Sequence, residues 1–378
     1  MIRILSVSPV GHFGGAEVLL LDVLAGLAKR GHQTLLISCG GDDQPELARL
    51  AGERGVEVST TPLARLRNPL ALRTTSAHVR RVARAFAAEV VHCNHPHGAL
   101  IGRLARVSRL PLSIQLLDPP PRRDPAATAM ALVRGDFVSI SHTTTDAYRR
   151  RLRLARTLET IRPGRDLGGF RTAAARGDAS RVLRSAGLDP AAAPLVVMVG
   201  RLQEFKGIFR LIDTAAMLPQ ATFIHIGPDA PTEPGTRERA KATILARGLT
   251  GRVGLAGPVA LADLAATVAR ADVLAHLAFG ETFGLVLVEA MAVGTPPVAM
   301  MGPGPCEILG NGGGILLLDG APRTVAAAVG GLLSDRSRLS VLAHAATESS
   351  GAFAIDRMVD EYERRFVRLV DKSATGQA

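Results

Sequence analysis

Two successive series of short apolar runs, separated by helical patterns, constrain the fold of this 378-residue chain more than any other feature. The first series predicts strands at 2–7, 33–38, 56–60, 90–93, 112–117 and 137–141. The second predicts strands at 194–200, 221–227, 252–257, 272–278, 295–300 and 313–318. Strand–helix alternation of this kind favours parallel sheets covered by helices on both faces. We therefore predict an α/β chain with two Rossmann-like, doubly wound domains.

A polar stretch rich in glycine and alanine, at about 164–190, interrupts the pattern and predicts a domain boundary. We place an N-terminal domain at 1–168 and a second domain at 185–354. A last helix at 355–371 carries an apolar stripe that must be buried, formed by Met358, Tyr362, Phe366 and Leu369. Open parallel sheets bind ligands at the carboxyl ends of their strands. Two such domains facing each other would form a deep cleft.

The charge balance is basic, with 45 Lys and Arg against 34 Asp and Glu. Much of the positive charge lies at 65–86 and 148–165. These clusters fit an acidic acceptor or an anionic membrane surface. The solvated helix faces of a protein from an arginine-rich genome are the favoured interpretation. Because aromatic residues make only 3% of the chain and Trp is absent, a stacking platform for single-stranded nucleic acid is not expected.

Three features predict a cytoplasmic location. Cys39, Cys93 and Cys306 are odd in number and lack metal-binding spacing, which fits buried thiols in a reducing compartment. The first residues are typical of a strand rather than of a signal peptide. No uncharged apolar run reaches the ~18 residues of a membrane span. A peripheral membrane contact stays open, and we expect a frayed tail at 371–378.

The segment GHFGGAEVLLLDVL, at 11–24, follows the first predicted strand. Gly14 and Gly15 would allow a ligand to approach the backbone, and the helix that begins there offers free amide donors. A diphosphate or a sugar would fit this place. The spacing is not that of the G-x-G-x-x-G dinucleotide motif, and a plain tight turn explains the glycines equally well.

The segment GRLQEFKGI, at 200–208, follows the strand at 194–200. Arg201 and Lys206 are two cations at one strand exit, and Gly207 releases the chain into a helix. Two converging cations suit a diphosphate. The chain contains only four lysines, which gives Lys206 added weight. A solvated basic loop is the alternative.

The segment GETFGLVLVEAMAVGTP, at 280–296, places Glu281 in a loop and Glu289 about one turn inside an apolar helix that begins near Gly284 or Leu285. The first amides of such a helix can bind an anion, and a carboxylate can accept bonds from sugar hydroxyls. A buried carboxylate without a partner is costly, which favours a ligand at Glu289. The two carboxylates of a glycoside hydrolase would stand roughly 5–9.5 Å apart, whereas eight helical residues span about 12 Å. This distance speaks moderately against Glu281 and Glu289 as a hydrolase pair, because the loop between them could shorten it. We find no D-x-D pair and no His/Cys cluster, and we therefore expect neither a metal nor a cofactor.

Taken together, these motifs resemble the retaining glycosyltransferases of family four, also called group 1, which have the GT-B fold. The resemblance extends over nearly the whole chain and is strongest in the second half. It rests on GGAE at 14–17, VVHCNHPHGALIGRLAR at 90–106, SISHTTTDAYRRRL at 139–152, TIRPGRDLGGF at 160–170, VGRLQEFKG at 199–207, IHIGPD at 224–229, RVGLAGPV at 252–259, the long segment 269–299 and GPGPCEIL at 302–309.

The resemblance implies roles for individual residues. Arg201 and Lys206 would hold the donor diphosphate as it leaves, and Glu281 would contact the transferred sugar. Glu289 would bind the ribose of the nucleotide, and Gly15 would lie by the phosphate from the other domain. Further donor contacts are implied at Thr282, Phe283, Gly284 and Leu285, and near the base at Gly257, Pro258 and Val259. In such enzymes the last helix crosses back onto the first domain.

One departure concerns the acceptor side. Many members carry a histidine just after the strand at 112–117, where this chain has Leu117 and Asp118. His95 or His97 is a substitute candidate, and PPPRR at 119–123 is a candidate lid or acceptor loop. Neither the nucleotide, UDP or GDP type, nor the acceptor, a small molecule, a lipid or a glycan, is fixed by the sequence.

The expected activity is metal-independent transfer of a sugar, with retention, from a nucleotide-sugar to an acceptor hydroxyl. The arginine- and alanine-rich composition indicates a bacterium of high GC content, in which the family serves secondary-metabolite, glycolipid and polysaccharide biosynthesis. Two alternatives stay open. One is another GT-B enzyme, such as a sugar-nucleotide epimerase, with a phosphorylase disfavoured. The other is a non-catalytic basic binding protein. The oligomeric state is not predicted.

Overall fold

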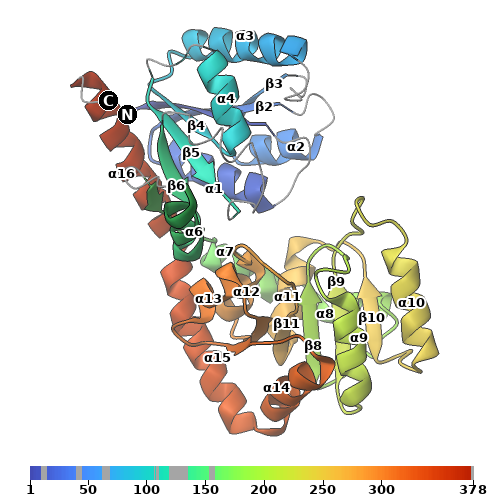
Figure 1. Cartoon of the computed structure of the whole chain (residues 1–378). Helices are drawn as coiled ribbons and strands as arrows, with labels where there is room; N and C mark the ends of the chain where they lie inside the picture. The colour runs from blue at the N-terminus through green and yellow to red at the C-terminus, as the bar shows by residue number, and fades with distance from the viewer. Residues whose placement is uncertain are drawn as a thin grey trace. The chain divides into compact units, whose positions relative to one another are not determined.

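The computed structural model describes residues 1–9, 15–39, 45–61, 69–105, 107, 110–118, 135–152 and 158–375. They form two compact units. Unit 1 comprises residues 1–164 and 355–378, and unit 2 comprises residues 165–354. Each unit is built on a parallel sheet with helices on both faces (Figure 1), which confirms the predicted α/β class with two Rossmann-like sheets. Within the described ranges, no helix combines the length and the apolar character needed to cross a membrane.

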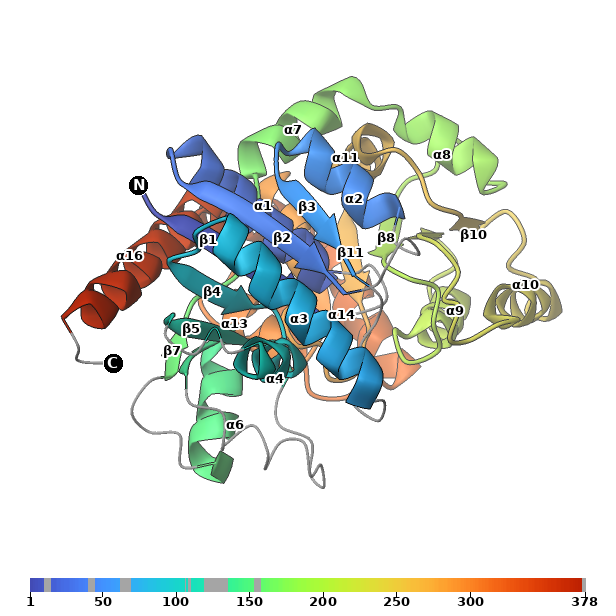
Figure 2. The ribbon, with the colours of Figure 1, turned by 90° about the horizontal axis from the view of Figure 1, so that it is seen from above.

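The sheet of unit 1 has the strand order β3-β2-β1-β4-β5-β6-β7. Its strands are β1 (Arg3–Ser8), β2 (Gln33–Ser38), β3 (Glu57–Thr60), β4 (Val90–Cys93), β5 (Leu112–Leu116), β6 (Asp136–Ser139) and β7 (Leu158–Thr160). The helices are α1 (Gly15–Lys29), α2 (Pro45–Glu53), α3 (Pro69–Ala85), α4 (Pro96–Leu104), α6 (His142–Leu152) and α16 (Ile355–Ala374). Figure 2 shows α3 and α4 along one face of this sheet, and their apolar side chains share a core with Leu5 and Val7 of β1.

Helix α16 is the last element of unit 1 and packs against α1, where Val359 contacts Gly26. All four residues of the predicted stripe are at most 4% exposed, which confirms that the stripe is buried. The rings of Tyr362 and Phe366 meet the His92 ring of β4 edge-on, at centroid distances of 5.7 and 5.5 Å. The helix continues to Ala374, so the expectation of a frayed tail from residue 371 is wrong.

The sheet of unit 2 has the order β10-β9-β8-β11-β12-β13. Its strands are β8 (Leu195–Val199), β9 (Thr222–Ile226), β10 (Val253–Ala256), β11 (Val273–His276), β12 (Pro297–Met300) and β13 (Ile315–Leu317). Its helices are α7 (Leu167–Arg176), α8 (Ala179–Ser185), α9 (Ile208–Met217), α10 (Thr236–Ala246), α11 (Leu261–Arg270), α12 (Leu285–Ala292), α13 (Pro303–Leu309), α14 (Pro322–Ser334) and α15 (Arg336–Ser350), with the short 3-10 turn η2 (Gly351–Phe353).

The strands of unit 2 are apolar on both faces because both faces are covered. Val196 and Met198 of β8 join the core beneath α9, α10 and α14, while Leu195 and Val197 point to the opposite face and are equally buried. Burying one such side chain contributes about 1.5–3 kcal/mol, so these continuous apolar strands fix the sheet in the interior. The loops at its carboxyl edge are then left to carry polar groups.

Candidate functional site

A partly buried ion pair joins the two strongest sequence motifs in unit 2. Lys206 Nζ lies 2.6 Å from Glu281 Oε2. Lys206 belongs to the loop between β8 and α9, and Glu281 to the loop between β11 and α12. Because β8 and β11 are neighbouring parallel strands, their following loops meet at the carboxyl edge of the sheet. The two residues predicted to handle phosphate and sugar are therefore in direct contact.

His276, the last residue of β11, approaches the same carboxylate. Its Nε2 lies 3.4 Å from Glu281 Oε2, and the two side chains are 7% and 14% exposed. Burial alone would raise the pKa of Glu281, but the contact with His276 and the charge of Lys206 hold this pKa at about 2. Glu281 is therefore an anion at any physiological pH, able to accept hydrogen bonds but not to donate a proton.

Both contacts use only one oxygen of Glu281. Among the described residues, no hydrogen bond or ion pair reaches Oε1. A carboxylate oxygen has two lone pairs and binds hydroxyl groups well. Oε1 is thus available for a ligand while Oε2 is held by the protein.

Two glycines shape the backbone around this pair. Gly207 (φ 97°) precedes α9, and Gly284 (φ 90°) precedes α12. Neither position supplies a side-chain cap, so no capping side chain competes with an anion for the first N–H groups of each helix. A Cβ at Gly207 would lie 2.6 Å from the carbonyl oxygen of Leu277, so only glycine fits that turn. The predicted start of α12 near Gly284 or Leu285 is confirmed.

The remaining predicted donor contacts in unit 2 lie in loops of the same edge. Arg201 is exposed and makes no hydrogen bond or ion pair with a described residue. Thr282 is half-buried, whereas Phe283 is buried and its ring meets that of Phe353 at 6.0 Å. Gly257, Pro258 and Val259 follow β10, the edge strand, and Pro258 is exposed. Their contact with a donor stays a prediction.

Glu289 is buried in α12 as predicted, but it is not without a partner. Arg165 Nε donates to Glu289 Oε1 at 2.7 Å, and a second guanidinium nitrogen also contacts that oxygen. The argument that a bare buried carboxylate demands a ligand is therefore wrong at this position, because Arg165 already compensates its charge. Glu289 remains a predicted ribose contact on the strength of the motif alone.

The predicted site residues of unit 1 lie at the start of α1, at the start of α4 and after β5. Gly15 is the exposed first residue of α1. His95 caps α4, where its Nδ1 accepts a hydrogen bond from the amide of His97 at 3.2 Å. Burial and the nearby His97 lower the pKa of His95 to about 4, so the ring is neutral near pH 7. Asp118 is exposed beyond the end of β5. Gly14 and the segment 119–123 lie outside the described residues.

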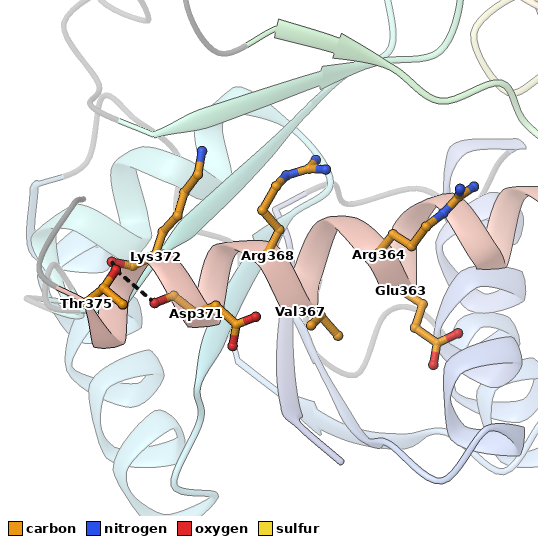
Figure 3. A pocket seen from close by; sticks show the side chains of 7 residues that line it. All are labelled: Glu363, Arg364, Val367, Arg368, Asp371, Lys372 and Thr375. Atoms are coloured by element: carbon orange, nitrogen blue, oxygen red, sulfur yellow. Dashed lines mark hydrogen bonds between the residues drawn. The ribbon is translucent and has the colours of Figure 1, made fainter.

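A groove of about 600 Å³ runs along α16 in unit 1. Its lining comprises Glu363, Arg364, Val367, Arg368, Asp371, Lys372 and Thr375. Figure 3 shows the basic side chains spread along the helix rather than converging on one point. No group of three or more His, Cys, Asp or Glu is placed to hold a metal ion in the described part of the chain. That the protein needs neither a metal nor a cofactor stays a prediction.

Two functional candidates were missed from the sequence. His276 lies within the segment 269–299 but was given no role there, although a polar residue at the end of an apolar strand is a usable signal. Arg165 lies 124 positions before its partner Glu289, and no local pattern links them.

Comparison with known proteins supports the assignment of these motifs. The model of the family described as Glycosyltransferase Family 4 matches residues 13–168, and that described as Glycosyl transferases group 1 matches residues 182–349. The matching curated relatives include D-inositol 3-phosphate glycosyltransferases. The protein of Segniliparus rotundus is 30% identical over 54% of this chain and 45% of its own length. That of Salinispora tropica is 33% identical over 54% and 44%. The chain thus spans less than half the length of these relatives.

Solved structures share the fold over almost the full chain. Anabaena HepE, in complex with UDP and glucose, superposes with a TM-score of 0.83 at 24% identity, covering 97% of this chain and 100% of that one. A glycosyltransferase of Rickettsia africae superposes with a TM-score of 0.85 at 16% identity, covering 98% of each chain. These neighbours establish the GT-B type of fold. The two family models, which follow one another along most of the chain, show that the chain belongs to the group 1, family four glycosyltransferases.

Proposed function

We propose that the protein transfers a sugar, with retention and without a metal, from a UDP-sugar to an acceptor hydroxyl. The observation that carries this proposal is the partly buried Lys206–Glu281 pair beside the amino-terminal ends of α9 and α12. Such a place suits a diphosphate beside a hydroxylated ring. UDP as the nucleotide is supported by the neighbour HepE, which was crystallised with UDP and with UDP-glucose.

Each residue has a distinct role in this reaction. Lys206 and Arg201 neutralise the diphosphate as the bond between the anomeric carbon and the phosphate oxygen breaks. Glu281 Oε1 accepts a hydrogen bond from a hydroxyl of the sugar. Glu289 binds the ribose. The acceptor oxygen forms its new bond on the face from which the phosphate leaves, and a phosphate oxygen takes the acceptor proton.

The acceptor is proposed to be a small polyol, glycolipid or glycan hydroxyl, in a cytoplasmic bacterial pathway and with a peripheral membrane contact if the acceptor is a lipid. The D-inositol 3-phosphate glycosyltransferases suggest an inositol phosphate as the first compound to try. We do not expect nucleic acid as a partner.

The test is a transfer assay with UDP-glucose and GDP-mannose, each with and without inositol 3-phosphate and in the presence and absence of EDTA. We expect product from the UDP-sugar with the α configuration of the donor retained, unchanged by EDTA. Lys206→Ala should reduce turnover more than tenfold. The control is Lys241→Ala, because Lys241 is an exposed lysine on α10.

Three outcomes would contradict the proposal. Unchanged turnover in Lys206→Ala would remove the diphosphate role. An isomerised nucleotide-sugar in the absence of acceptor would indicate an epimerase. Salt-sensitive binding to anionic vesicles or DNA without any sugar-nucleotide turnover would indicate a basic binding protein.

A further inference from the structure

We propose that His276 is a positioning residue that holds Glu281 when Lys206 turns from this carboxylate to the diphosphate of the donor. This inference rests on the proposed function, because it assumes that a nucleotide diphosphate binds beside Lys206.

The geometry sets Lys206 and His276 on the same oxygen. Lys206 Nζ is in tight contact with Glu281 Oε2 at 2.6 Å, while His276 Nε2 stands back at 3.4 Å. That nitrogen is buried and has no hydrogen bond to any described residue. The 3.4 Å contact with Glu281 therefore lacks hydrogen-bond geometry, and this interaction is incomplete. A shift of roughly half an ångström, together with a turn of the ring that points Nε2–H at Oε2, would give a normal N–H···O bond.

The charges explain why a second donor is needed. In the ligand-free pair the ammonium of Lys206 compensates Glu281. A diphosphate carries more negative charge than one carboxylate and would draw the ammonium toward it. Glu281, whose side chain is only 14% exposed, would then be left without its main partner, and a buried unpaired carboxylate is strongly unfavourable. His276 is the nearby group able to take over.

The chemistry of the ring suits this task. Nε2–H is a donor in the imidazolium ion and in one of the two neutral tautomers, so the exchange requires no change of charge. His276 closes the strand β11, and this strand is held between β8 and β12. Its position is thus fixed by the sheet, whereas Lys206 and Glu281 lie in loops. A donor on a rigid strand keeps Oε1 directed at the sugar while Oε2 changes partner.

The experiment is a double-mutant cycle read out as UDP affinity by calorimetry, with turnover of UDP-glucose as a second readout. We expect His276→Leu to weaken UDP binding and to lower kcat/KM about tenfold or more. In the Glu281→Gln background the same change should cost less than twofold, because a neutral amide does not need a compensating donor. His276→Gln, which keeps a donor, should restore most of the loss.

The control is His344→Leu. His344 Nε2 also stands 3.4 Å from a carboxylate, that of Glu348, but both side chains are exposed on α15, so this change should leave UDP binding and turnover unaltered. Thermal unfolding of each variant separates loss of binding from loss of fold.

Equal losses in the wild-type and Glu281→Gln backgrounds, or no loss at all, would overturn the role of His276. If the wild-type protein bound no UDP, the proposed function would fail and this inference with it. A structure of the wild-type protein with UDP gives a test that needs no variant. Lys206 should contact phosphate, with His276 Nε2 within hydrogen-bond distance of Glu281. Lys206 still on Oε2 and His276 unmoved would contradict the inference.

Discussion

The pKa of Glu281 gives a prediction whose size follows from the structure. Its folded-state pKa is about 2 against an ordinary value of 4.5. A depressed carboxylate pKa stabilises the folded state above the unfolded-state pKa, and this stabilisation is lost as pH falls toward the folded-state pKa. The full difference corresponds to about 3 kcal/mol at neutral pH. By pH 3.5 about 1.4 kcal/mol of it should be gone, since the carboxyl of the unfolded chain is then protonated about ten to one while that of the folded chain is still ionised.

The assay is urea unfolding of the wild-type protein and of Glu281→Gln at pH 6, 5, 4 and 3.5, monitored by a signal from unit 2. The amide in the variant does not titrate, so the other carboxylates cancel in the comparison. The difference in unfolding free energy, wild type minus variant, should shrink by about 1.4 kcal/mol between pH 6 and pH 3.5. A difference that stays constant across this range would refute the reasoning that Lys206 and His276 hold Glu281 in its ionised form.

Three further predictions concern single substitutions elsewhere in the two units. Gly207→Ala should destabilise unit 2 by about 2 kcal/mol or more in thermal unfolding, because φ is 97° and the new Cβ meets the Leu277 carbonyl. The control Gly331→Ala should not destabilise, because Gly331 lies in helix α14 with open space around it and Ala is the better helix former. Arg365→Met should destabilise unit 1 by about 3 kcal/mol in thermal unfolding, because Arg365 is buried and donates to Ser113 Oγ and the Asp136 carbonyl. Its control is Arg364→Met, because Arg364 is exposed on the same helix. Glu289→Gln should weaken UDP binding about tenfold and leave pyrophosphate binding unchanged, since the predicted contact is to ribose. Equal weakening of both would mean that Glu289 acts only through its ion pair with Arg165.

Strand positions could be predicted closely because the sequences of buried parallel strands are uninterrupted apolar runs. All twelve predicted strands are present, and the additional strand, β7, is only Leu158–Thr160. Three residues with one buried side chain carry too little hydrophobic pattern to be distinguished from a loop. The stretch 164–190 was predicted as a break from its glycine and alanine content, yet it forms α7 and α8, which begin at the Asp166 and Asp178 caps.

Proximity of site residues could be predicted where it follows from sheet topology, and not where it depends on side chains far apart in the sequence. Lys206 and Glu281 could be brought together because each follows a strand of one parallel sheet. The partner of Glu289 could not be predicted. Arg165 is the first residue of unit 2 and lies 124 positions before Glu289 in the sequence. His276 was missed because its importance comes from the proximity of one buried nitrogen to Glu281, which no sequence pattern records.

The central claim is that Lys206 and Arg201 bind the diphosphate of a nucleotide donor. The most direct measurement is the dissociation constant of UDP, and of uridine as the phosphate-free control, for the wild-type protein and Lys206→Ala. We predict at least a tenfold loss for UDP, about 1.4 kcal/mol, with no change for uridine. Equal affinities of the two proteins for UDP would contradict the account.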